Sequence, residues 1–185
     1  MPSHLSTMNR RALLVLGAAT LLARPGLAAD VRDLPWEELV PKGWDPMAGF
    51  KRPPNMGLMS DADPRMQELM RALRESWDQA PTRPELDGKA VQISGYLVPL
   101  EQARGEVSEF LLVPYFGACI HTPPPPANQI VHVLPARPAK GLRAMEVVTV
   151  RGKLSVARSD SAMGVSAYRI DGAAVEICTP PDRTR

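Results

Sequence analysis

The residues with reactive side chains gather in one short passage of this sequence, PYFGACIHTPPPPANQ, at residues 114–129. Cys119 and His121 lie two residues apart and are followed by four consecutive prolines. Residues two apart on a strand point to the same side, so this thiol and this imidazole can contact one ligand. Thiolate and imidazole are preferred ligands of Zn²⁺. The passage therefore predicts a candidate zinc site at Cys119 and His121.

Two more residues are candidates to complete this site. His132 alternates with apolar residues in a predicted strand and would be the third ligand, and Cys178, the only other cysteine, would be a fourth. Cys178 is also a candidate disulfide partner of Cys119, because an oxidising compartment favours pairing of two cysteines. A third hypothesis is structural: Cys119 is a small buried side chain, and the imidazoles hydrogen-bond nearby groups. The sequence leaves all three hypotheses open.

The sequence does not predict a catalytic site. A Cys–His nucleophile needs an orienting group and an oxyanion hole, and Asn128 and Gln129 are near Cys119 only in sequence. The chain has no G-x-S-x-G motif, no glycine-rich phosphate loop and no H-E-x-x-H motif. We therefore expect a binding protein, not an enzyme. A thiol-dependent enzyme or redox protein using Cys119 is the rival hypothesis.

The proline run, Pro123–Pro126, suggests a further alternative. Consecutive prolines hold a stiff polyproline II course and supply no backbone donors. This segment is expected to form a rigid rim between two strands. A protein–protein interaction module that docks its partner on this rim is therefore a third candidate function.

The first 28 residues have the layout of a secretory signal peptide. Arg10 and Arg11 precede an uncharged run of 12 residues, Ala12–Ala23, and small residues at Gly26 and Ala28 precede the predicted cut. We expect export to the periplasm, by the Sec route rather than the twin-arginine (Tat) route. The run is too short to span a bilayer with ease, and no later apolar stretch is long enough. No membrane insertion is expected after the signal is cleaved.

Charge argues against nucleic acid as a partner. The segment 1–28 holds three of the 22 basic residues and none of the 20 acidic ones, so the exported part keeps 19 basic against 20 acidic side chains. A protein that binds nucleic acid by neutralising phosphates needs a basic excess. We expect no nucleic-acid binding.

Two segments precede the predicted sheet. Residues 29–62 are rich in proline and tryptophan, which predicts an extended arm that packs through Trp36, Trp44 and Phe50. Residues 63–80 predict an amphipathic helix, because Asp63 suits the N-cap and Pro64 the first turn. Its apolar stripe is expected to pack on the core and consists of Met66, Leu69, Met70, Leu73 and Trp77.

Residues 86–178 change to a period of two. Five strands are predicted, at 91–97, 109–115, 129–134, 146–156 and 166–177, and residues 179–185 are expected to form a flexible tail. Gly95, Gly152 and Gly172 interrupt three strands, and a glycine inside a strand marks a bulge or bend. The fold expected is mainly β: an OB-like five-stranded Greek-key barrel with one N-terminal helix and the extended Pro/Trp-rich arm.

Several stretches resemble bacterial exported proteins grouped as domain of unknown function 3299. They are WEELVPKGWDP (36–46), ISGYLVPLE (93–101) and SEFLLVPYFGACIHTPPPPANQIV (108–131), with later GKL and AYRI segments. The resemblance implies a periplasmic OB-like protein. Some members are encoded beside ABC-type export or zinc-responsive systems, which implies a zinc-handling accessory protein with an envelope protein or transporter component as its partner. No catalytic residue carries over, and Cys178 matches no position of the family motif.

Overall fold

The structure is a computed structural model, and it describes residues 31–48, 50–51, 56–60, 62–118 and 124–178. The predicted signal peptide (1–28), Cys119, His121, Pro123 and the predicted tail (179–185) lie outside the described residues. The elements run in the order β1 (Arg32–Asp33), η1 (Trp36–Leu39), η2 (Met56–Leu58), α1 (Pro64–Asp78), η3 (Pro84–Leu86), β2 (Ala90–Ala103), β3 (Glu106–Val113), η4 (Ala127–Gln129), β4 (Val131–Pro135), β5 (Ala139–Lys140), β6 (Val147–Ser161) and β7 (Gly164–Ile177).

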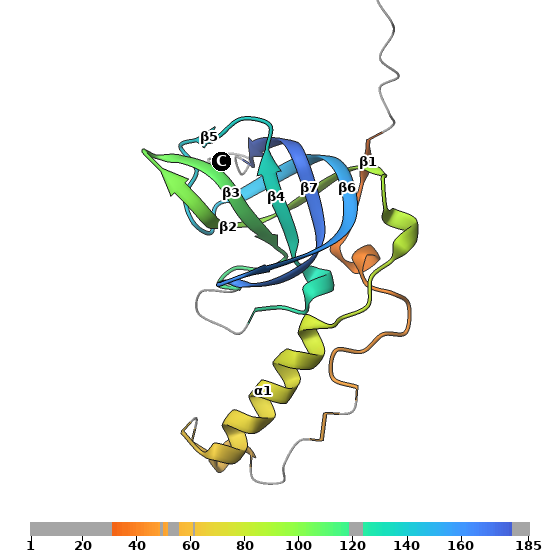
Figure 1. Ribbon diagram of the computed structural model, residues 1–185, viewed down its shortest axis with the longest axis vertical. Coiled ribbons are helices and arrows are strands. Elements are labelled where there is room, and N and C mark those ends of the chain that lie inside the picture. The colour runs from red at the N-terminus through yellow and green to blue at the C-terminus, as the bar shows by residue number, and fades with distance from the viewer. Residues whose placement is uncertain (1–30, 49, 52–55, 61, 119–123, 179–185) are drawn as a thin grey trace, which may run out of the picture.

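The strands form one seven-stranded sheet, so the mainly β prediction is confirmed (Figure 1). Neighbouring strands follow the order β1-β2-β6-β7-β4-β3-β5, and β2 also pairs with β3. The five long strands therefore make a closed circuit of pairings, β2-β6-β7-β4-β3-β2. Within it only β4 and β7 run parallel, and the other pairs are antiparallel.

The strand count corrects the prediction of five strands. The five longer strands overlap the predicted ranges with different bounds, and β1 and β5 are additional strands of two residues each. β1 pairs with β2, and β5 pairs with β3. So short a strand carries no hydrophobic alternation, and the sequence pattern therefore could not reveal it.

Two of the interrupting glycines lie at bulges, as predicted. The pairing of β6 with β7 shifts register across Gly152, and β4 skips Gly172 when it pairs with β7. A Cβ at Gly152 would overlap Cγ2 of Ile170, so only glycine allows the two strands to approach here. Gly172 has a φ of +63°, a left-handed conformation that glycine adopts without strain.

Buried apolar side chains form two clusters on opposite faces of β2 and β3. The main core takes Leu97, Phe110 and Leu112 from these strands, together with residues of every other long strand. The smaller cluster consists of Val98, Leu111, Val113, Ala118 and Ile130. Side chains alternate along a strand, so β3 is buried on both faces, which explains its continuous apolar sequence.

The N-terminal arm packs against the sheet. Leu34 and Leu39 belong to the main core, and Trp36 and Trp44 pack against it. The indole of Trp36 donates to the Ser94 carbonyl at 2.7 Å. The arm therefore contributes apolar surface that the strands alone do not supply.

Helix α1 begins and ends close to the predicted residues. Asp63 is its N-cap and accepts a hydrogen bond from the Arg65 amide, with Pro64 in the first turn. Figure 1 shows α1 standing away from the strands, next to the returning arm. The structure corrects the expected packing of its apolar stripe: Met66 is buried, but the other four residues are only half-buried, and none of the five belongs to either core cluster.

Periodicity shows that a helix has an apolar face but not what covers that face. Here the arm supplies residues to the core that α1 was expected to fill. No helix within the described ranges is long and apolar enough to cross a membrane.

Candidate functional site

The predicted zinc ligands are placed only in part. Cys119 and His121 lie outside the described residues, so the structure does not test their proximity. His132 and Cys178 are both described. Within the described ranges, no group of three His, Cys, Asp or Glu side chains is arranged to hold a metal ion.

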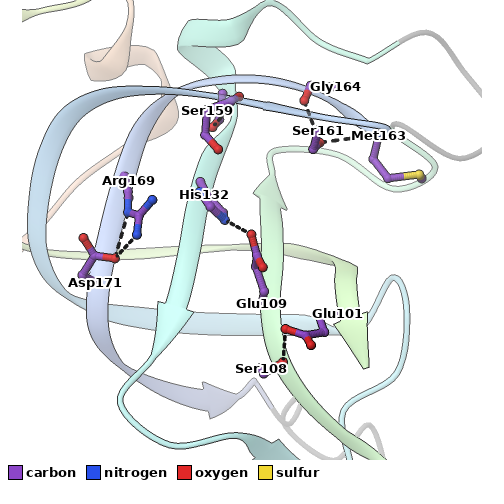
Figure 2. A network of polar contacts seen from close by, with 11 residues as sticks. Glu101, Ser108, Glu109, His132, Ser159, Ser161, Met163, Gly164, Arg169 and Asp171 are labelled. Atoms are coloured by element: carbon purple, nitrogen blue, oxygen red, sulfur yellow. Dashed lines mark hydrogen bonds and ion pairs between the residues drawn. The ribbon is translucent and has the colours of Figure 1, made fainter. Parts of the chain in front are cut away.

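His132 is a buried imidazole on β4 and is 3% exposed. Its neighbours Val131 and Val133 point into the main core, so His132 points to the opposite face of the strand. There its Nε2 lies 2.6 Å from Oε1 of Glu109 on β3, and the two side chains point toward each other (Figure 2). Its Nδ1 is buried and has no hydrogen-bond partner among the described residues.

This arrangement has a specific chemical meaning. A histidine that ligates a metal usually holds one ring nitrogen against a carboxylate, which orients the ring and leaves the other nitrogen for the metal. His132 has such a carboxylate in Glu109, whose side chain is 34% exposed. A buried nitrogen without a partner carries a cost of desolvation, so Nδ1 is the atom of this pair that can still gain from a ligand.

Cys178 lies in a different environment. It follows the end of β7, its amide donates to the Val147 carbonyl at 2.9 Å, and its Sγ lies 2.8 Å from the Thr149 hydroxyl. His132, by contrast, lies beside Arg169 in the middle of β7. Cys178 forms no disulfide with any described residue, and its predicted partner Cys119 is outside them.

One further buried polar group joins three segments. The Tyr168 hydroxyl donates to the Leu39 carbonyl and accepts from the Arg83 amide, both at 2.7 Å. Burial raises the pKa of this phenol above its ordinary value. Leu39 belongs to the arm and Arg83 follows α1, so these two hydrogen bonds connect β7 to both segments.

The exposed side of the α1 stripe forms an apolar groove of about 310 Å³. Met70, Leu73 and Trp77 of α1 form its floor, and Pro124 of the proline run also lines it. Arg71, Arg74 and Asp78 complete the lining. Arg71 pairs with Glu68 and Glu75, whereas Arg74 has no ion-pair partner within the described ranges.

The described prolines separate this groove from a second one. Pro124 lines the α1 groove, whereas Pro125 and Pro126 line a groove of about 410 Å³ on the arm. Pro126 has φ −54° and ψ 147°, close to polyproline II geometry. Pro124, Pro125 and Pro126 thus lie between two concave surfaces.

Sequence reasoning missed Glu109 and the α1 groove. Glu109 lies in β3, just before the residues of that strand that are apolar on both faces, and nothing in that pattern relates it to His132, which is 23 residues away. The stripe of α1 was recognised in the sequence, but it was interpreted as core. Its two methionines were the available signal, because methionine is common at adaptable binding surfaces.

Fold and surface define a class: a mainly β protein whose long strands pair in a closed circuit, with an external helix that offers an apolar groove. The sequence matches the family model described as "Protein of unknown function (DUF3299)" over residues 36–177, and the chain belongs to that family. The resemblance seen in the sequence is therefore confirmed.

A solved structure agrees with this assignment. The crystal structure of a DUF3299 family protein from Pseudomonas aeruginosa PAO1 is similar, with a TM-score of 0.63 and 34% sequence identity. The match covers 82% of this chain and 98% of that one. No curated protein matches the sequence significantly.

Proposed function

We propose that this protein is a non-enzymatic binding or accessory protein of the periplasm, and that it docks a protein partner in the α1 groove. The observation that carries the proposal is the half-buried apolar stripe of α1, which joins neither core cluster. The apolar face of an amphipathic helix is normally buried. An apolar face that stays accessible to solvent and lines a groove is typical of an interaction site.

The groove best suits an amphipathic helix as the occupant. Met70 and Leu73 offer an adaptable apolar floor, and Trp77 offers a large aromatic surface, which is the residue type that dominates binding energy. Arg74 at the rim favours acidic side chains beside the partner's apolar stripe. The partner is therefore a helix-in-groove ligand, carried by an envelope protein or by a component of an envelope ABC-type transport system.

We further infer that the circuit of five long strands is an OB-like Greek-key barrel. Its support is the pairing of β2 with both β3 and β6, together with the parallel pairing of β4 and β7. OB-fold barrels commonly bind extended ligands on one sheet face, but a fold does not by itself assign a function. The binding proposal therefore depends on the α1 groove and not on the barrel.

The docking proposal is tested with a fluorescent, acidic, amphipathic helical peptide as the probe. We expect saturable binding to the mature protein and a loss of at least about tenfold in affinity for Leu73→Asp, because an unpaired charge then lies in the apolar floor. Gln102→Asp is the control, since it adds the same charge at an exposed position of β2. Equal binding by both variants, or no binding by the wild type at about 1 mM, would remove the proposal.

Zinc handling is the second candidate, and the orientation of His132 by Glu109 favours it. Cys119 and His121 would supply the other ligands, whereas Cys178 lies against Val147 and Thr149, away from His132. Isothermal titration of the reduced protein should give much weaker Zn²⁺ binding for the Cys119→Ser, His121→Ala variant. Glu109→Gln should weaken binding about 10- to 100-fold, as expected when an orienting carboxylate is lost.

The same variants separate zinc handling from its rivals. Equal affinity of the wild type and the Cys119→Ser, His121→Ala variant would reject the zinc site. Rapid labelling of the Cys119 thiol at neutral pH would instead favour the thiol-dependent enzyme or redox protein.

A further inference from the structure

Trp44 differs from the other two tryptophans in its hydrogen bonding. The indole of Trp36 donates to the Ser94 carbonyl, and the indole of Trp77 donates to the Pro46 carbonyl, each at 2.7 Å. The Trp44 indole has no acceptor within the described part of the chain, although the side chain packs against the main core. A half-buried tryptophan usually finds a partner for its N–H, so this donor is available to a ligand.

Trp44 lines the 410 Å³ groove on the arm side of the proline run. Pro46, Tyr115, Pro125 and Pro126 line the same groove. Tyr115 is 45% exposed. The groove therefore presents aromatic and prolyl rings, which are flat and rigid, with one indole N–H.

The charged side chain that lines this groove is acidic. Glu37 is an exposed lining residue, and its carboxylate has no ion-pair partner among the residues that the structure describes. No lysine or arginine lines the groove. A ligand that carries a cation is therefore favoured over an acidic one.

We propose that this groove binds an extended, proline-rich peptide segment that carries a basic residue. A polyproline II peptide has no internal hydrogen bonds, so its carbonyls can accept from the Trp44 indole. Its prolyl rings pack on aromatic walls, and its fixed backbone loses little entropy on binding. The basic residue would pair with Glu37 at the rim.

This site is independent of the α1 groove. Of these two grooves, Pro124 lines the α1 groove, whereas Pro125 and Pro126 line the Trp44 groove. A partner could occupy one groove without the other. Failure of the helix-docking proposal would leave this one standing, and the reverse also holds.

The test measures fluorescence anisotropy of a labelled RPLPPLPPL peptide with the mature protein. We expect saturable binding, weakened about fivefold in Trp44→Phe, which keeps an aromatic ring but removes the donor of one hydrogen bond. Glu37→Gln should weaken binding about twofold and reduce its dependence on salt. The same peptide with serine in place of each proline should not bind.

Two controls make the result specific. Leu73→Asp, in the other groove, should bind the peptide with wild-type affinity, and thermal unfolding should show that Trp44→Phe remains folded. Glu37 is exposed, so Glu37→Gln provides a second test that does not depend on packing.

Four results of the peptide experiments would overturn the proposal. They are no binding by the wild type at about 1 mM peptide, unchanged affinity in both Trp44→Phe and Glu37→Gln, equal binding of the serine peptide, and displacement of the proline peptide by the acidic helical peptide. Self-association of the protein that Trp44→Phe abolishes would show a second copy as the occupant and would also overturn it.

Discussion

The His132–Glu109 pair is the most distinctive polar contact of the molecule. His132 is buried, and within the described residues its side chain has Glu109 as its only hydrogen-bond partner, through Nε2. Figure 2 shows the pair between β3 and β4, while Ser108 donates to Glu101 nearby. The carboxylate of Glu109 stabilises the folded protein, because without it the buried imidazole would lose its one hydrogen bond.

Glu109→Ala should therefore lower the free energy of unfolding by about 1–3 kcal/mol, since both ring nitrogens of His132 would then be buried without a partner. Urea denaturation at neutral pH measures this change. Glu101→Ala is the matched control, because this exposed carboxylate accepts from Ser108 and from no other residue in the described ranges. The control should stay within about 0.5 kcal/mol of the wild type, and an equal loss in both variants would contradict the argument.

At the scale of single elements, the bulges decide how the strands curve. Gly152 lies where β6 shifts register against β7, and Ile170 fills the space beside it. Gly172 lies close by on β7 and has open space around it but a positive φ. The two glycines are thus required for different reasons, one steric and one conformational.

Gly152→Ala should destabilise the protein by about 1–3 kcal/mol, because the added methyl group overlaps Ile170. Gly172→Asn should cost less, since asparagine tolerates the left-handed conformation and meets no neighbouring atom. Thermal unfolding of the two variants gives the comparison. A larger loss for Gly172→Asn would show that backbone strain, not overlap, dominates at this bend.

Helix α1 illustrates how an element can be predicted while its packing is not. Asp63 and Pro64 begin the helix as their types predict. The stripe from Leu69 to Trp77 has the right spacing for burial, yet it lines grooves at the surface. Spacing is a local property, whereas the surface that covers a helix comes from segments distant in sequence.

At the scale of the whole molecule, Tyr168 connects the sheet to the segments that precede it. Its hydroxyl joins the Leu39 carbonyl of the arm and the Arg83 amide that follows α1. The arm also supplies Leu34 and Leu39 to the core. The sheet, the arm and the connection after α1 are therefore expected to unfold together.

Tyr168→Phe should cost about 1–3 kcal/mol, because it leaves two backbone groups without their partner. Burial raises the pKa of Tyr168, so the folded state holds the phenol proton to a higher pH than the unfolded state does. Its contribution is complete below the unfolded pKa of about 10 and is lost as pH rises above that value. Urea denaturation from neutral to alkaline pH should show this extra loss in the wild type but not in Tyr168→Phe.

Tyr96→Phe is the control for this measurement. Tyr96 is half-buried and packs edge-on against Phe116, and its hydroxyl has no hydrogen-bond partner among the described residues. Its stability should stay close to the wild type at neutral pH, and it should keep the alkaline loss. Equal pH profiles for wild type and Tyr168→Phe would show that another group causes that loss.

Local patterns in the chain were enough for the mainly β class, the approximate places of the longer strands, the helix with its cap and two of the three glycine bends, since Gly95 pairs without a register shift. Each depends on residues a few positions apart, whose alternation or backbone preference acts within one element. Family membership likewise followed from contiguous motifs and is confirmed over residues 36–177.

The pairings between distant residues came only from the folded chain. β1 and β5 are too short for a pattern, His132 meets Glu109 across two strands, and Trp44 meets the prolines across more than 80 residues. Such contacts depend on how the whole sheet closes and on which surfaces remain uncovered. The alternation along a strand predicts the face on which a side chain lies. Which residue it contacts on that face depends on the complete fold.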